Sequence, residues 1–349
     1  MSEQILNDVL SSLKVISIPT RTKFRGITLR EIALFEGPSG WAEFSPFLEY
    51  DENESLPWLM SGIEAAFARP LPMLRTEIPI NATMPEVDDR AEIEKILSWY
   101  PGATTVKIKV GTDLTRDLAR IAWVKALSPH SHIRLDVNGS WSVEHALNAI
   151  NAIYEIIGNS FQYVEQPCST IEELRKLKSA LKVPVKIAGD EVFRKARDPF
   201  AVDISDALDI MILKVAPLGG IRRSLKLAEH HKLPTVVSSA LESAIGLSYE
   251  LKLAATLPEL DYACGLGTGS LLQFDVADVT IVNGHITVQS LIPDQNALET
   301  LRASDERFAW WQDRIRKTWS AGASQWLERE SEEWKGYSCT FYQGARSLV

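Results

Sequence analysis

The chain has 349 residues, of which 45% are hydrophobic and 24% are charged, and its formal net charge is −9. This length is sufficient for a (β/α) barrel of about 250 residues plus a smaller unit, and the composition is that of a globular protein rather than a disordered one. The acidic balance, without a cluster of Lys and Arg, argues against nucleic acid and anionic membrane surfaces as partners.

The sequence also predicts a compartment. The N-terminal segment MSEQILNDVL lacks a basic stretch followed by an apolar core, so we expect no signal peptide. No apolar run approaches about 18 residues, so we expect no membrane-spanning helix. Cys168, Cys264 and Cys339 are far apart and fit buried free thiols in a reducing environment. These features predict a cytoplasmic protein.

Residues 1–78 are predicted to form an α+β unit. Lys14–Thr20 and Ile27–Phe35 are rich in β-branched residues, and the segment GPSG predicts a turn into a third strand at Trp41–Phe47. A helix is expected over Glu54–Ala68.

Residues 79–272 show a repeating unit in which short apolar segments alternate with helical patterns. The segments are TTVKIKV, HIRLDV, FQYVEQ, VKIAGD, DIMILK and TVVSS, and they end at Lys109, Asp136, Glu165, Asp190, Lys214 and Ser239. These ends are 24 to 29 residues apart, which suits one strand, one helix and two loops and predicts a parallel sheet. With Ile80–Ala82 before the series and Tyr262–Leu266 after it there are eight units. Eight units favour a closed barrel over an open doubly wound sheet, for which no G-x-G-x-x-G loop is present.

Residues 273–349 are predicted to pack on the other two parts. Asn283-Gly284 between Val279–Val282 and His285–Val288 is a strong hairpin signal. One helix is expected from about Asn296 to Thr318. The tail is rich in tryptophan, which is typical of a segment that packs back onto the body, and we assign no function to residues 322–349.

The strand ends carry the candidate chemistry. Active sites of such barrels lie at the C-terminal ends of the strands, so five neighbouring strands would bring Lys109, Asp136, Glu165, Asp190 and Lys214 to one mouth. Lys109 alone fits a strand with a wet face, and Asp136 or Glu165 alone fits the end of a strand. Lys214 is harder to explain in this way, because a charged residue in a buried strand is rare unless it is paired. Together, in step with the strand period, they favour a functional site.

Three carboxylates from neighbouring strands, Asp136, Glu165 and Asp190, suit Mg²⁺, and Mn²⁺ could replace it. No histidine belongs to the group, which argues against zinc. A lysine with a lowered pKa beside another positive charge, as Lys107 lies two residues from Lys109, can act as a base. A lysine base together with a divalent cation suits a reaction that removes a proton next to a carboxylate, because the cation stabilises the negative charge that develops.

The segments KIKVG, RLDVNGSW, YVEQPC, KIAGDE and ILKVAPLGG resemble motifs of the enolase superfamily, in its muconate-lactonising-type branch. FRGITLRE, GWAEFSPFLEY, PINAT, VVSSALESAIGL and ACGLGTG resemble the o-succinylbenzoate synthase family within it. The resemblance implies an α/β fold, a modified TIM (β/α) barrel with an α+β capping domain. The cap would be completed by C-terminal segments, and its loop around Thr20–Gly26 would close over the substrate.

The resemblance also implies a reaction, the dehydration of 2-succinyl-6-hydroxy-2,4-cyclohexadiene-1-carboxylate to 2-succinylbenzoate in menaquinone biosynthesis. Lys109 would remove and return the proton, Lys214 would stabilise the intermediate, and Asp136, Glu165 and Asp190 would hold the metal. The remaining residues expected to bind substrate or support the site are Lys107, Arg134, Asn138, Glu191, Ser238, Ser239, Gly219 and Gly220. The implied partner is a small-molecule carboxylate, and no obligate protein partner is evident.

Two alternatives stay open. N-acylamino acid racemases and dipeptide epimerases of the same superfamily use the same two lysines and metal, so the sequence does not exclude those activities. Gly189 and Val192, next to Asp190, depart from the pattern expected for the family and leave the substrate fit open. A barrel that only binds ligands is disfavoured, because all five mouth residues are present.

Overall fold

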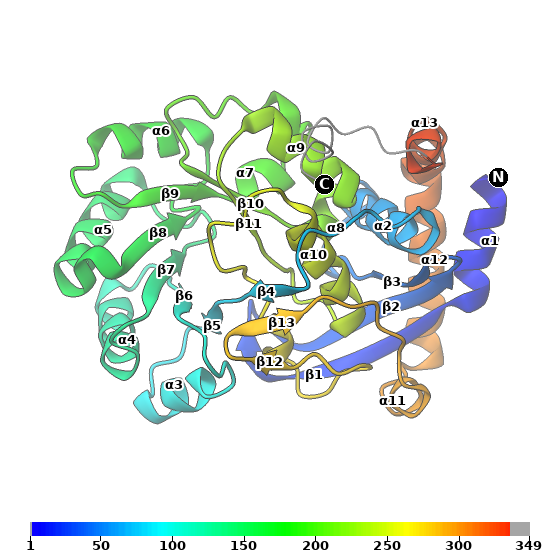
Figure 1. Ribbon diagram of the computed structural model, residues 1–349, viewed down its shortest axis with the longest axis horizontal. Helices are drawn as coiled ribbons and strands as arrows, with labels where there is room; N and C mark the ends of the chain where they lie inside the picture. The colour runs from blue at the N-terminus through cyan, green and yellow to red at the C-terminus, as the bar shows by residue number, and fades with distance from the viewer. Residues whose placement is uncertain (1, 336–349) are drawn as a thin grey trace.

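The computed structural model describes residues 2–335, so Cys339 and the rest of the predicted tail lie outside the described residues. Figure 1 shows two bodies side by side: a barrel of strands ringed by helices, and a smaller body formed by both ends of the described chain.

The barrel contains a seven-stranded sheet in which neighbours in space are neighbours in sequence and all pairs are parallel. Its strands are β5 (Ala82–Met84), β6 (Thr105–Lys109), β7 (His132–Asp136), β8 (Phe161–Glu165), β9 (Lys186–Gly189), β10 (Ile210–Leu213) and β11 (Thr235–Val237). The predicted order of strands is therefore confirmed.

A short eighth segment closes the barrel. Cys264 bridges to Ile80 and Gly265 bridges to Ser238, both in parallel orientation. The amide of Asn81 donates to the carbonyl of Cys264 at 2.9 Å, and the amide of Gly265 donates to Val237 at 2.8 Å. The first strand differs slightly from the prediction: Ile80 forms only this bridge, and the pairing with β6 begins at Ala82.

Helices cover the outside of the barrel (Figure 1). They are α3 (Arg90–Leu97), α4 (Leu114–Leu127), α5 (Val143–Ile157), α6 (Ile171–Ala180), α7 (Glu191–Arg194), α8 (Val215–Leu218), α9 (Ile221–His231) and α10 (Ala244–Thr256). The link between β9 and β10 differs from the others, because it contains only the four-residue α7 and a short 3-10 turn at Pro199–Ala201. Cys168 and Cys264 are buried free thiols, as expected.

The second body has an antiparallel sheet of β1 (Lys14–Phe24), β2 (Ile27–Gly37) and β3 (Gly40–Phe44). Both faces are covered. Val15, Ala33 and Phe35 pack in a cluster with Trp58 and Trp311, whereas alternate residues, which include Ile16, Ile18 and Leu34, pack against Leu241 and Ile245 of the barrel. Burial on both faces explains the dense apolar sequence of these strands.

Helices α1 (Ser2–Ser12), α2 (Glu52–Phe67), α11 (Gln295–Thr300), α12 (Asp305–Thr318) and α13 (Ser324–Lys335) complete this body, and a π-helical turn, Trp319–Ala323, joins the last two. A small sheet of β12 (Ile281–Val282), β13 (His285–Thr287) and β4 (Glu77–Pro79) lies beside the barrel. The hairpin at Asn283-Gly284 is confirmed, and its pairing with β4 was not expected.

Two predictions about elements were wrong. The helix expected over Asn296–Thr318 is interrupted at residues 301–304, where Arg302 forms a bridge with Ile16 of β1. The expected loop at Thr20–Gly26 is mostly strand, because β1 runs to Phe24 and only Arg25 and Gly26 form the turn.

Four tryptophans of the C-terminal segment pack back as expected, and Trp310 is exposed. The four lie in the cluster with α2 and β3: Trp311, Trp319, Trp326 and Trp334. The domain boundaries at residues 78 and 272 stay predictions. Among the described helices, no helix is both long enough and apolar enough to span a membrane.

Candidate active site

The sheet register brings three of the predicted residues to one level. Lys109 pairs with Asp136 across β6 and β7, and Asp136 pairs with Glu165 across β7 and β8. Asp190 directly follows β9 and Lys214 directly follows β10. All five therefore lie at the C-terminal ends of consecutive parallel strands, where barrel enzymes have their active sites.

One carboxylate oxygen links two lysines. Oδ2 of Asp136 lies 2.7 Å from Nζ of Lys109 and 3.3 Å from Nζ of Lys107. Lys107 also lies 3.1 Å from Oε2 of Glu165 and 3.5 Å from Oγ of Ser238. Lys107 is thus held by two carboxylates, whereas Lys109 is nearer the mouth.

The opposite wall is built around Asp190. Its Oδ2 accepts a hydrogen bond from Nζ of Lys214 at 2.6 Å, and both its oxygens accept from Nε of Arg194 at 3.1 and 3.2 Å. Asp190 is 1% exposed, so two cations neutralise a fully buried charge.

The neighbouring carboxylates favour the charged form of Lys107. Burial lowers the pKa of Lys107, but Glu165 and Asp136 outweigh burial and raise this pKa far above its ordinary value. Lys107 therefore stays protonated and cannot accept a proton near neutral pH.

The carboxylates differ as well. Burial raises the pKa values of Asp136 and Asp190, but neighbouring cations outweigh it and hold both well below the ordinary range: Lys109 and Lys107 for Asp136, Arg194 and Lys214 for Asp190. Burial, and next the charge of Asp136, raise the pKa of Glu165 to about 7. Further positive charge is needed to keep all three ionised together.

The residues present fit a hard divalent cation by the chemistry of their donors. They offer carboxylate oxygens only, and Oδ1 of Asp136 is buried without a hydrogen-bond partner. Within residues 2–335, no three His, Cys, Asp or Glu side chains already surround one metal position. The three carboxylates are instead turned toward Lys107, Lys109, Lys214 and Arg194, and a cation would take over part of that neutralisation.

A polar chain connects the two walls. Nζ of Lys109 donates to Oδ1 of Asn138 at 2.6 Å, and Nδ2 of Asn138 donates to Oε1 of Glu191 at 3.1 Å. Glu191 is also paired with Arg194. Glu191 begins α7 rather than occupying the outer face of a strand, because β9 ends at Gly189.

Arg134 lies one layer deeper in the barrel. It pairs in register with Lys107, is fully buried, and donates to Asn81, Gln162 and the carbonyl of Ala263 at 3.1, 2.6 and 2.6 Å. These contacts direct its guanidinium toward the inner layer rather than toward the carboxylates at the mouth.

The remaining predicted contacts are spread out. Ser238 lies beside Lys107, and Ser239 is hydrogen-bonded to Thr268. Gly219 and Gly220 lie where α8 meets the second body. A Cβ on Gly219 would touch Trp326, and a Cβ on Gly220 would overlap the carboxylate of Glu64. The substrate-binding roles of these four residues stay predictions.

The structure adds residues that the sequence analysis missed. Arg194 binds Asp190 and also donates to the hydroxyl of Tyr50 at 3.3 Å, and the ring of Phe24 lies 5.6 Å from Nζ of Lys109. The spacing of Asp190 and Arg194, four residues apart, is a helix-pair signal that could have revealed the first contact. Tyr50 and Phe24 carry no such signal, because they come from the other body.

Comparisons with known proteins show the family and the fold of the chain. Residues 15–66 match the family described as enolase N-terminal domain-like, and residues 90–293 match the family described as enolase C-terminal domain-like. Muconate lactonizing enzyme from Pseudomonas fluorescens has a similar fold, with a TM-score of 0.69 at 21% identity over 84% of this chain and 98% of that chain. The L-Ala-D/L-Glu epimerase from Bacillus subtilis gives a TM-score of 0.68 at 21% identity over 80% of this chain and 96% of that chain. The chain belongs to the enolase superfamily, and its fold is a barrel with a capping domain.

Sequence relatives define the family more narrowly. The o-succinylbenzoate synthase of Mycobacterium marinum is 47% identical over 315 residues, which cover 89% of this chain and 94% of that protein. The o-succinylbenzoate synthase of Mycobacterium tuberculosis is 46% identical over 319 residues, which cover 90% of this chain and 96% of that protein. The chain belongs to the o-succinylbenzoate synthase family, and it is a lyase.

Proposed function

We propose that this chain dehydrates 2-succinyl-6-hydroxy-2,4-cyclohexadiene-1-carboxylate to 2-succinylbenzoate, a step of menaquinone biosynthesis. One observation supports the proposal most directly: Lys109 and Lys214 stand on opposite sides of Asp136, Glu165 and Asp190 at one barrel mouth. This arrangement suits removal of a proton next to a carboxylate.

Asp136, Glu165 and Asp190 are the residues that would hold Mg²⁺, or Mn²⁺ in its place. When bound, the cation supplies positive charge at the substrate carboxylate, where negative charge grows as the proton leaves.

Lys109 is the proposed base. It takes the proton from the ring carbon that bears the carboxylate, and it must first be neutral and leave Asp136. The C–O bond to the hydroxyl then breaks, the ring becomes aromatic, and the ammonium of Lys109 returns its proton to the departing oxygen as water. Lys107 remains charged and lies too deep for this role.

Lys214 is proposed to stabilise the enediolate as a cation over its face. Its contact with Asp190 places the ammonium opposite Lys109 in the order of the strands. The cytoplasmic location and the absence of an obligate protein partner stay predictions.

The test follows the loss of diene absorbance when the substrate is added to purified protein with Mg²⁺. Wild-type protein should turn over rapidly, and Lys109→Ala should lose at least about 10⁴-fold in kcat, because general base catalysis alone contributes about 10² to 10⁴ and the same group also serves as the acid. Binding of the metal to both proteins, measured by calorimetry, is the control.

Absence of turnover by metal-loaded wild-type protein would contradict the proposal. Both lysines are present, so racemisation of N-succinyl amino acids is then the activity to measure, by exchange of solvent deuterium into the α-carbon.

A further inference from the structure

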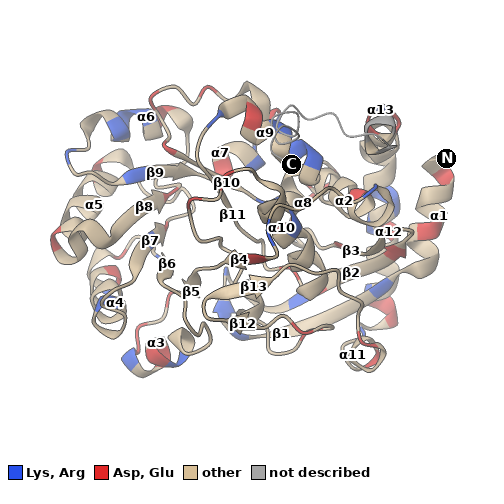
Figure 2. Cartoon of the chain, viewed as in Figure 1, with Lys and Arg blue, Asp and Glu red and all other residues tan. Residues whose placement is uncertain are grey.

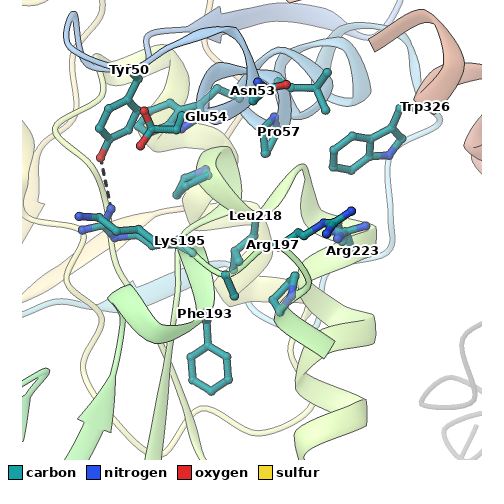
Figure 3. Close-up of a pocket in the computed structure, with 16 residues that line it drawn as sticks. Tyr50, Asn53, Glu54, Pro57, Phe193, Lys195, Arg197, Leu218, Arg223 and Trp326 are labelled. Atoms are coloured by element: carbon teal, nitrogen blue, oxygen red, sulfur yellow. Dashed lines mark hydrogen bonds between the residues drawn. The ribbon is translucent and has the colours of Figure 1, made fainter. Parts of the chain in front are cut away.

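A cavity of about 350 Å³ lies outside the barrel mouth, between the start of α2 and the irregular link from β9 to β10 (Figure 3). Its walls come from residues 50–58, from 193–199 and from 217–223, with Trp326 of α13 on one side. Lys109, Asp136, Glu165 and Lys214 do not line it. Its volume is within the range of small-molecule sites, about 300–1,000 Å³.

The cavity is strongly basic in a chain that is acidic as a whole. Arg194, Lys195, Arg197 and Arg223 line it, and Glu54 is its one acidic wall residue. Figure 2 shows Lys and Arg on α9 and near α7, on the side of the barrel that faces α2. Such a local excess attracts anions.

Three of these cations are available to a ligand. Among the side chains that the structure describes, Lys195, Arg197 and Arg223 have no hydrogen-bond or ion-pair partner, whereas Arg194 is held by Asp190 and Glu191. Arg223 instead lies over the rings of Trp326 and Phe200, at 4.8 and 5.3 Å. Burial lowers the pKa of Arg223, so its charge is already partly removed from water.

The same walls offer ring faces and one spare donor. Leu218 and Pro57 lie on facing sides of the cavity, with the indole of Trp326 at its edge (Figure 3). Trp326 is 8% exposed, and its Nε1 is a buried donor without a hydrogen-bond partner. Buried indole N–H groups usually have a partner, so a ligand acceptor would satisfy this one.

We propose that this cavity is a second binding site, separate from the barrel mouth, for a small aromatic carboxylate. The ring lies between the apolar walls, and the carboxylate binds Arg223 and Arg197, a geometry for which guanidinium groups are suited. Because Arg194 belongs both to the cavity wall and to the Asp190 cluster, an occupant lies one side chain from the catalytic centre.

The test is calorimetric titration of the full chain with 2-naphthoate, once with Mg²⁺ and once with EDTA. We expect one site with a Kd at or below about 1 mM in both buffers. Arg197→Gln and Arg223→Gln should each weaken binding about tenfold. Trp326→Phe, which keeps a ring and removes the N–H, should weaken it severalfold.

Arg90→Gln, an exposed arginine on α3, is the matched control and should bind as wild type does. Three outcomes would overturn the proposal. Absence of binding would mean that the ligand has no site, and binding that EDTA abolishes would place the ligand at the metal centre. Equal weakening by Arg90→Gln would show that binding depends only on net charge. Arg197 is exposed, so its substitution leaves folding intact and keeps the test decisive if Arg223→Gln is unstable.

Discussion

Asn138 combines an uncommon backbone conformation with two functional contacts. Its φ is 51°, in the left-handed region that asparagine tolerates better than most residues. From there its amide accepts from Lys109 and donates to Glu191. Asn138 is thus a positioning residue for the proposed base, and the turn after β7 determines where it points.

Asn138→Gly should lower kcat about 10- to 100-fold with little change in KM. Glycine keeps the left-handed backbone, so the loss reports the missing side chain, which leaves Lys109 with Asp136 as its remaining hydrogen-bond acceptor. Asn283→Gly is the matched control, since Asn283 has φ 49° in the distant β12–β13 turn. An equal loss of kcat in both variants, or a change confined to KM, would refute the positioning role.

At the residue scale, the sequence identified the residues that end a strand or directly follow one. Lys109, Asp136 and Glu165 alternate correctly along apolar segments, and alternation determines which face a strand residue takes. Arg194, Tyr50 and Phe24 could not be found in this way, because their contacts depend on how the second body sits over the barrel.

At the scale of elements, α11 and α12 are separated by a break that the sequence did not predict. Apolar periodicity continues through residues 296–318, so the sequence predicts one helix. In the structure the amide of Ser17 donates to the carbonyl of Leu301, and the amide of Ala303 donates to Val15. Pairing with β1 therefore competes with helical hydrogen bonds and prevails at this point.

Substitution of Ser304 tests that interpretation, because the sign of the change in the free energy of unfolding depends on whether the helix is interrupted. Its hydroxyl accepts from the amide of Arg307 and caps α12. Ser304→Ala should therefore lower the free energy of unfolding by about 1 kcal/mol in urea. Inside one continuous helix, alanine would instead raise it by a few tenths of a kcal/mol.

Ser179→Ala, at an exposed position within α6, is the control and should show that small gain. A gain of stability at Ser304 as well would mean that residues 296–318 form one helix in solution.

At the scale of the whole molecule, buried carboxylates join the two bodies. Glu43 of β3 accepts from the amides of Ser243 and Gly246 at 3.1 Å each, at the start of α10. Glu64 of α2 accepts from Arg222 at 2.8 Å, in a pair that is also buried. Groups on the other body bind both carboxyl groups, so the stability of the interface depends on the protonation state of Glu43 and Glu64.

The free energy of unfolding should depend on pH through the titration of Glu43. Burial, and next the charge of Glu242, raise its pKa from 4.5 to about 7. Between these values the folded chain keeps a proton that the unfolded chain has lost, so this contribution is complete below about pH 4.5 and is lost as pH rises through about 7. The shift corresponds to at most about 3 kcal/mol.

Glu43→Gln removes the titratable carboxyl group and keeps the shape of the side chain. Relative to wild type, its free energy of unfolding in urea should rise by about 1–3 kcal/mol from pH 5 to pH 8, with Mg²⁺ present throughout. The exposed Glu49→Gln should follow wild type at every pH. A Glu43→Gln curve parallel to that of wild type would show that Glu43 is ionised in the folded chain already at pH 5.

The sequence by itself determined the barrel, its strand order and the five ionisable groups at its mouth. These properties follow from local periodicity: apolar runs at a constant spacing specify strands and helices, and the last residue of a parallel strand lies at the catalytic edge whatever surrounds it.

Only the tertiary structure decided the contacts between distant segments. The pairing of Arg302 with Ile16 that interrupts the C-terminal helix and the cavity beside Arg194 each join stretches separated by many residues. Their energies come from hydrogen bonds and burial between bodies, and local sequence patterns carry no information about such pairings.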